Sequence, residues 1–199
     1  PGNGGTLSIT EQVTLNVSPE VGDAPISLTG GAGNIVISGN LVLYENTTFT
    51  TVAGDVTFGG TVNTDGVGPW TLTVNAGGVT QFGGAVGNTN PVGSVTTNAG
   101  GSTQLNGGAV TTSGTQTYGD AVSLGVNTTL TGTTVTFSNT VNGARTLGVT
   151  GNASFGGVVG GGTALTSVSV SGTSAINTTG ITTSGTQKIG RASCRERVC

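Results

Sequence analysis

Short stretches in which apolar and polar residues alternate run along almost the whole of this 199-residue chain. Such alternation buries one side of a β-strand, and helix-forming residues are scarce, whereas glycine and threonine each number 39. Clusters rich in glycine and asparagine separate the stretches, and both residue types are expected to supply the positive φ angles of tight turns. The sequence therefore predicts an all-β fold, with strands at residues 7–10, 13–17, 56–58, 72–74, 122–124, 135–137 and 168–170.

The chain also repeats itself, because four segments of its first half recur in the same order in its second half. The matched segments are 46–50 with 127–131, 56–63 with 135–142, 82–86 with 155–159, and 111–116 with 182–187. Their offsets shrink from 81 to 79, 73 and 71 residues. The second copy has therefore lost short pieces, which we assign to turns such as 65–69, as a stacked solenoid tolerates.

Repetition of this kind favours a parallel, right-handed β-helix or solenoid built from imperfect repeats. A coil of about 20 residues can hold two or three strands of about five residues, so each copy would form three or four coils stacked about 4.8 Å apart. An antiparallel sandwich is the competing fold, since it also has frequent turn signals. We favour the solenoid because no domain boundary is visible and eight aromatic residues give no sign of an aromatic core cluster.

The last twelve residues, 188–199, differ from the rest and hold four of the five basic residues and both cysteines, Cys194 and Cys199. They resemble the translation of a common sequencing adapter, apart from Cys199, and such additions do not belong in fold reasoning. The junction lies inside a repeat, because Thr117 follows the first Thr-Thr-Ser-Gly-Thr-Gln and Lys188 follows the second. The expected organisation is N-terminal coils at 1–39, a first copy at 40–116, a truncated second copy at 117–187 and a non-native tail at 188–199.

Without this tail the chain is acidic and very sparsely charged. Residues 1–187 have one basic residue, Arg145, and seven acids, a net charge of −6. Binding to nucleic acid or to an anionic membrane surface needs clustered basic residues, and no run of about 18 apolar residues exists to enter a bilayer. Residues 1–187 also lack His, Lys and Cys, which removes most general bases and nucleophiles. We expect no enzyme activity, no cofactor and no metal site.

Two carboxylates, two glycine-rich segments and one tryptophan are the candidates for a functional site. Asp55 and Asp65 could form a carboxylate pair of the kind used by polysaccharide-degrading β-helices. Residues 30–34 and 83–87 begin like a calcium-binding nonapeptide, but neither reaches the required Asp. Trp70, the only tryptophan, follows Pro69 in a longer turn and could stack on a sugar, although packing over a coil edge is the more common role.

Threonine patterns raise one further idea. Thr71-Leu-Thr73 and Thr134-Val-Thr136 are triplets of the kind that can order water in flat arrays and so bind ice. The sequence does not show these triplets recurring once per coil in a fixed register, and β-branched threonine is favoured on any exposed strand. Ice binding is therefore not expected from the sequence.

Together these segments resemble the β-strand-repeat passenger regions of large bacterial secreted and surface proteins, including autotransporter-associated β-strand repeats and filamentous-haemagglutinin-like adhesins. The resemblance covers most of residues 40–187 and is carried by residues 46–63, 75–86, 111–122 and 127–142.

This resemblance implies a non-catalytic structural and adhesive stalk, exported across the outer membrane to the cell surface. Its partner would be an unidentified surface receptor or a glycan, and its cut edge at residue 187 would favour end-to-end self-association. The alternatives are a carbohydrate-binding β-domain that uses Trp70 and a polysaccharide-degrading β-helix.

Overall fold

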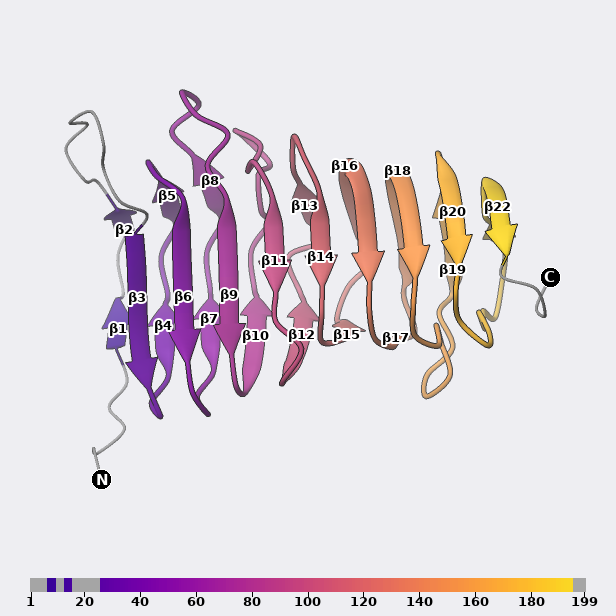
Figure 1. Cartoon of the computed structure of the whole chain (residues 1–199), viewed down its shortest axis with the longest axis horizontal. Helices are drawn as coiled ribbons and strands as arrows, with labels where there is room; N and C mark the ends of the chain where they lie inside the picture. Colours follow the sequence, from indigo (N-terminus) through magenta and orange to yellow (C-terminus); the bar gives the residue numbers. More distant parts are fainter. Residues whose placement is uncertain (1–6, 10–12, 16–25, 195–199) are drawn as a thin grey trace.

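The described part of the chain forms a parallel β-solenoid of about eight turns, without a helix (Figure 1). The computed structural model describes residues 7–9, 13–15 and 26–194. The near strands in Figure 1 run downward while the chain advances from N to C and returns upward behind them, so the coil is right-handed. The predicted all-β solenoid is thus confirmed. Residues 10, 16 and 17 of the expected strands, and 195–199 of the tail, lie outside the described residues.

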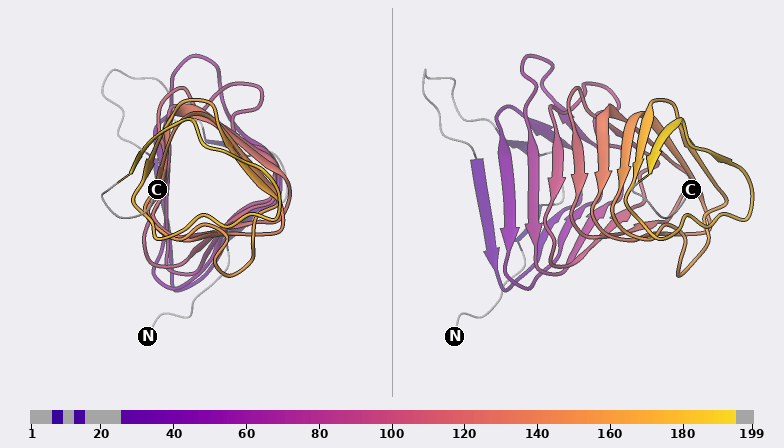
Figure 2. Two further views of the ribbon diagram at one scale, coloured as in Figure 1. Left: turned by 90° about the vertical axis from the view of Figure 1, so that its right-hand side faces the viewer. Right: turned by 45° about the vertical axis from the view of Figure 1, so that its right-hand side comes forward.

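Each turn of the solenoid crosses three flat faces, which give it a triangular cross-section (Figure 2). Face 1 contains β1 (Leu7–Ile9), β4 (Ile35–Ile37), β7 (Val56–Phe58), β10 (Val79–Phe82), β12 (Ser102–Leu105), β15 (Ala121–Leu124) and β17 (Val141–Asn142). Face 2 contains β2 (Val13–Leu15), β5 (Leu41–Leu43), β8 (Val62–Thr64), β13 (Ala109–Thr111), the first parts of β16 (Thr128–Phe137) and β18 (Thr146–Phe155), β19 (Ser167–Val170) and β21 (Gln187–Lys188).

Face 3 is the near face in Figure 1. It contains β3 (Ile26–Gly31), β6 (Thr47–Thr51), β9 (Leu72–Ala76), β11 (Val95–Thr97), β14 (Gln116–Tyr118), the second parts of β16 and β18, β20 (Thr173–Ile176) and β22 (Arg191–Cys194). β16 and β18 belong to two faces because each bends around a corner without losing its pairing. The register of their ladder shifts between Thr131 and Thr134, next to that bend.

Apolar side chains fill the interior in columns that run along the solenoid axis. On face 1, successive turns stack Ile37, Phe58, Phe82, Leu105 and Leu124 in direct register, and all five are buried. As expected from the sequence, the described residues contain no single aromatic core cluster, but the aromatic rings do contact one another. All five phenylalanines are buried, and they form axial stacks instead of one globular cluster, with ring centroids 5.3 Å apart for Phe58 and Phe82 and 5.6 Å apart for Phe137 and Phe155. Because equivalent positions lie one strand spacing apart, offset stacking of rings is the natural arrangement.

Polar side chains are also buried among the described residues. The hydroxyls of Thr80 and Ser174 have no hydrogen-bond partner there, whereas the Gln116 side chain is fully hydrogen-bonded. The Gln116 side chain donates to the carbonyls of Val110 and Thr131 at 3.0 and 2.9 Å. It also accepts a 2.9 Å hydrogen bond from the Tyr118 hydroxyl. Burial raises the pKa of the Tyr118 phenol far above its ordinary value, so this hydroxyl stays a donor. A buried polar network with its hydrogen bonds made is tolerated in an apolar core.

Glycine and asparagine serve different purposes at the corners, in contrast to the single role expected for both. Among the described residues every positive φ belongs to a glycine, as at Gly87 and Gly160. Asparagines instead reach across to the adjacent turn with their side chains. The Asn34 Oδ1 accepts from the backbone N–H of Asp55 at 2.8 Å, and Asn152 Oδ1 accepts from that of Thr173 at 2.9 Å. The asparagine side chains therefore satisfy backbone donors where the strand ladder is interrupted.

The two sequence copies do not occupy equivalent faces. Residues 46–50 lie on face 3, whereas their match 127–131 lies on face 2. Residues 56–58 lie on face 1, and their match 135–137 lies on face 3. Each match lies eleven strand positions further along the chain. In this count β16 and β18 each take two positions, one per face, and the bridges at Val86, Val159 and Ile181 take one each. Since eleven is one short of four complete turns of three, the second copy is rotated by one face about the axis.

The matched segments nevertheless build the same local structure. In the first copy, Thr112 Oγ1 donates to the Gly114 carbonyl at 3.0 Å and Gln116 Nε2 donates to Val110. In the second, Thr183 Oγ1 donates to Gly185 at 2.8 Å and Gln187 Nε2 donates to Ile181 at 3.0 Å. The repeated unit is therefore a strand–corner–strand segment that fits more than one corner. The number of strands between matches is constant, so the shrinking offsets arise in the turns.

The tail predicted to be non-native continues the solenoid in the structure. β21 pairs with β19 through Lys188, and β22 pairs with β20 from Arg191 to Cys194. An open parallel edge offers free backbone donors and acceptors to any chain that follows. This pairing consequently does not distinguish native from foreign residues.

Close backbone approach at the corner between faces 1 and 2 leads to a stability prediction. A Cβ added at Gly84 would overlap the Gly60 carbonyl of the preceding turn, and one added at Gly107 would overlap Gly84. We expect Gly84→Ala to lower the free energy of unfolding by about 1–3 kcal/mol, because the stacked backbone must shift to make room. Denaturant unfolding followed by circular dichroism would measure the loss.

Gly180→Ala is the matched control, because no heavy atom lies within 4 Å of a Cβ added there. Its stability should stay within about 1 kcal/mol of the original. Equal losses for both variants would contradict the proposed close stacking.

Candidate functional surface

The two carboxylates proposed as a pair lie at different corners, and each accepts hydrogen bonds from backbone N–H groups. Asp55 directly precedes β7, at the corner between faces 3 and 1, and its Oδ1 accepts from the N–H of Val79 at 2.7 Å. Asp65 directly follows β8, at the corner between faces 2 and 3. The structure thus does not bring these two carboxylates together. The described residues also contain no group of three or more His, Cys, Asp or Glu side chains placed to hold a metal ion.

Trp70 closes the turn between β8 and β9, residues 65–71. Its indole Nε1 donates to Asp65 Oδ1 at 2.9 Å, and the same oxygen accepts from the N–H groups of Val67 and Gly68 at 3.0 and 3.4 Å. The ring is half-buried, packs against the apolar core and covers Gly68, where an added Cβ would overlap the indole. The indole N–H is therefore hydrogen-bonded within its own turn, and the ring packs as a lid over the edge of the coil.

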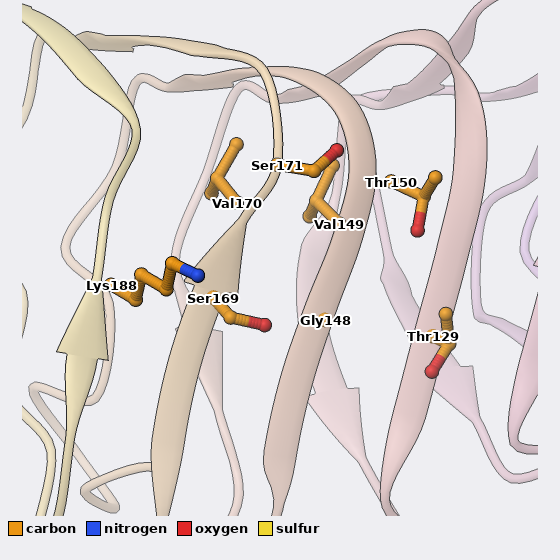
Figure 3. A pocket seen from close by; sticks show the side chains of 8 residues that line it. All are labelled: Thr129, Gly148, Val149, Thr150, Ser169, Val170, Ser171 and Lys188. Carbon is orange, nitrogen blue, oxygen red and sulfur yellow. The ribbon is translucent and has the colours of Figure 1, made fainter.

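A small hollow lies on face 2 near the C-terminal end (Figure 3). Its volume is about 270 Å³, and it lies over the outward positions Thr129, Gly148, Ser169 and Lys188, which are neighbours in successive turns. The absence of a side chain at Gly148 opens the space between the two hydroxyl residues. Its only charged residue is Lys188, which belongs to the predicted tail. Residues 1–187 contribute hydroxyl groups, backbone and the side chains of Val149 and Val170 to its lining.

Face 3 carries regular columns of small polar residues. One outward position is occupied in eight successive turns by Ser27, Thr48, Thr73, Thr96, Thr117, Thr136, Ser154 and Ala175, each directly paired with the next. We call this the central column. Residues two positions earlier in each strand form a parallel flanking column of Asn46, Thr71, Ser94, Thr115, Thr134, Asn152 and Thr173.

These columns correct the interpretation of the threonine triplets. The triplets at Thr71 and Thr134 are two members of a series that includes Ser94-Val-Thr96 and Thr115-Gln-Thr117. This series recurs in fixed register over four successive turns, and the turns on either side have Asn46, Asn152 or Ala175 at one of the outer positions. The recurrence is hidden in the sequence because turns of different lengths separate the triplets. Each triplet turns its outer residues to solvent and its middle residue inward, where Leu72, Val95, Gln116 and Val135 are buried.

Comparisons with protein-family models, with curated proteins and with solved structures found no match to this chain. The fold and the surface together define a right-handed parallel β-solenoid in which face 3 presents columns of hydroxyl residues. Nothing in the described residues is a helix that could cross a membrane.

The lid geometry of Trp70 gives a spectroscopic prediction. We expect Asp65→Ala to shift the Trp70 emission to longer wavelength and to increase its quenching by acrylamide, because the indole and two backbone N–H groups lose their acceptor. The loss of stability should be about 1–3 kcal/mol. Since Trp70 is the only tryptophan, its fluorescence reports this turn alone.

Asp55→Ala provides the matched control, because it removes a backbone acceptor at another corner. It should destabilise the chain without changing the emission of the folded protein. Unchanged emission in Asp65→Ala would show that the indole does not depend on this carboxylate.

Proposed function

We propose that this chain is a segment of a non-catalytic structural shaft, carried by an exported bacterial surface protein and used in adhesion. The observation that carries the proposal is the exchange of strand–corner–strand segments between faces. A shaft needs a unit that can be added repeatedly without closing the structure, and residues 111–116 and 182–187 behave as such a unit at two different corners. Stability then grows with the number of turns, since each turn contacts only its neighbours.

The surface chemistry suits an extended shaft in an open environment. The described residues before the tail carry four acids and one arginine, Glu45, Asp55, Asp65, Asp120 and Arg145. Asp120 is buried and accepts from the N–H groups of Gly100 and Gly101 at 2.9 and 2.8 Å. A sparsely charged Thr, Ser and Asn surface limits nonspecific charge-driven contacts, so adhesion would depend on a specific surface receptor or glycan.

Carbohydrate binding through Trp70 gains no support from the indole geometry, because its N–H is already bonded to Asp65 and its ring covers Gly68. A selective hit on a glycan array that disappears in Trp70→Ala would nevertheless favour a carbohydrate-binding domain over a shaft.

The shaft proposal predicts how the molecule grows. Inserting a second copy of residues 46–126 after residue 126 adds eleven strand positions, and the inserted strands enter on the face that residues 127–131 now occupy. We expect the maximum dimension from small-angle X-ray scattering to increase by about 18 Å, given a strand spacing of about 4.8 Å. The cross-sectional radius should not change.

An insertion of the same length with the order of its residues scrambled is the control, and it should widen the scattering profile without extending the rod. If the true duplicate also failed to lengthen the molecule, the copies would not be stackable units and the shaft proposal would be wrong.

A further inference from the structure

We propose that face 3 binds ice through its threonine array. The two columns place hydroxyl and methyl groups on a rectangular grid, with about 4.8 Å between turns and about 6.6 Å between alternate residues of a strand. The spacing between turns is close to the shorter oxygen repeat on the prism plane of hexagonal ice, and the spacing along the strand is somewhat below the longer one. The ligand is therefore the surface of a water crystal, and the site is the grid as a whole rather than a pocket.

The grid is held flat and rigid by the fold. The strands of face 3 lie side by side with little twist (Figure 1), and untwisted sheets are usually stabilised by stacking or by side-chain ladders. Stacking is present inside this solenoid, where Phe58 lies on Phe82 and Phe137 lies on Phe155. Threonine has few χ1 rotamers, so its hydroxyl and methyl groups keep their places on the grid.

The hydroxyls of the central column are available to water. The threonines at positions 48, 73, 96, 117 and 136 make no side-chain hydrogen bond to the described residues, while the flanking hydroxyls of Thr71 and Thr173 donate to Asn46 and Asn152 at 3.0 and 2.9 Å. These two flanking hydroxyls are thus oriented by the protein, and the hydroxyls of the central threonines must be satisfied by solvent. A row of equally spaced, unpaired hydroxyls beside methyl groups imposes one pattern on the first water layer.

Two matched positions carry a hydroxyl residue on face 3 and a different kind of residue at the counterpart on another face. Thr73 corresponds to Gly148 in the second copy, within the matched triplets Leu72-Thr-Val74 and Leu147-Gly-Val149. Thr73 lies on face 3, and Gly148 lies on face 2.

The same holds in the opposite direction. Ser154 on face 3 corresponds to Gln81 on face 1, each one residue before a matched phenylalanine. At these two positions the hydroxyl residue of face 3 is absent from its counterpart, whereas Thr48 and Thr136 match Thr129 on face 2 and Thr57 on face 1. The array therefore combines threonines shared by both copies with hydroxyl residues that occur on face 3 alone.

The chemistry of the grid argues for ice and against other ligands. Neither column contains a charged residue before Arg191, which continues the flanking column into the predicted tail. Nucleic acids need positive charge, and polysaccharide chains are commonly held by exposed aromatic rings, which neither column contains. A neutral array that repeats in two dimensions is complementary to a neutral crystal that repeats in two dimensions.

Ice-affinity partitioning of the full chain tests the proposal. Ice grown slowly from a dilute solution should incorporate the protein above the level of a protein that does not bind ice. Thr136→Tyr and Thr96→Tyr should each reduce incorporation to that background, because a ring rising from the central column keeps the flat face away from a flat crystal.

Thr57→Tyr is the matched control. Thr57 lies in the same Val-Thr-Phe sequence as Thr136 but faces outward on face 1, so this variant should incorporate as well as the original chain. Circular dichroism and unfolding curves confirm that the variants remain folded.

Background incorporation of the original chain would overturn the proposal, as would equal losses in Thr57→Tyr and Thr136→Tyr. Retention on insoluble cellulose or chitin that Thr136→Tyr abolishes, without ice binding, would assign the face to a crystalline polysaccharide instead. These results are separate from the shaft proposal, because elongation by insertion of residues 46–126 does not depend on what face 3 binds.

Discussion

The structure depends on in-register hydrogen bonding between the backbones of successive turns. Parallel ladders on all three faces place equivalent residues directly above one another, so each position in a turn becomes a column along the axis. Apolar columns form the core, glycine columns allow the corners to approach closely, and hydroxyl columns line face 3. A side chain therefore contributes less through its sequence neighbours than through residues about 20 positions away, as in the hydrogen bond between Asn34 and Asp55.

Much of this architecture could be predicted from local pattern. Alternation at Val56–Phe58 and Leu72–Ala76 predicts strands with one buried side, and the matched segments predict a stack of similar turns. The interior stacking of Phe58 on Phe82 could not be predicted in the same way, because it depends on which residue lies above which. That register is fixed by the lengths of the corners, which vary and leave no periodic signal in the sequence.

The candidate surface shows the same limit. Thr71 and Thr134 are visible as triplets in the sequence, but their membership in one grid appears only when the turns are aligned in space. The double role of Asp65, which accepts from two backbone N–H groups and from Trp70, was also not visible, since a lone acid in a turn can make many different contacts. Contacts within a strand follow from periodicity, whereas contacts across turns follow from the sum of all intervening loop lengths.

The rotation of one face per copy has a geometric consequence for any longer chain of this kind. Identical copies of eleven strands would each begin one face behind the last, so a surface feature encoded within the copy would wind around the rod as a helix and return to its starting face after three copies. A straight band such as the central column from Thr48 to Ser154 crosses that winding. The copies supply part of this band by differing from one another, as at Thr73 and Gly148. They supply the rest by carrying threonine outward on more than one face, as at Thr57 and Thr136.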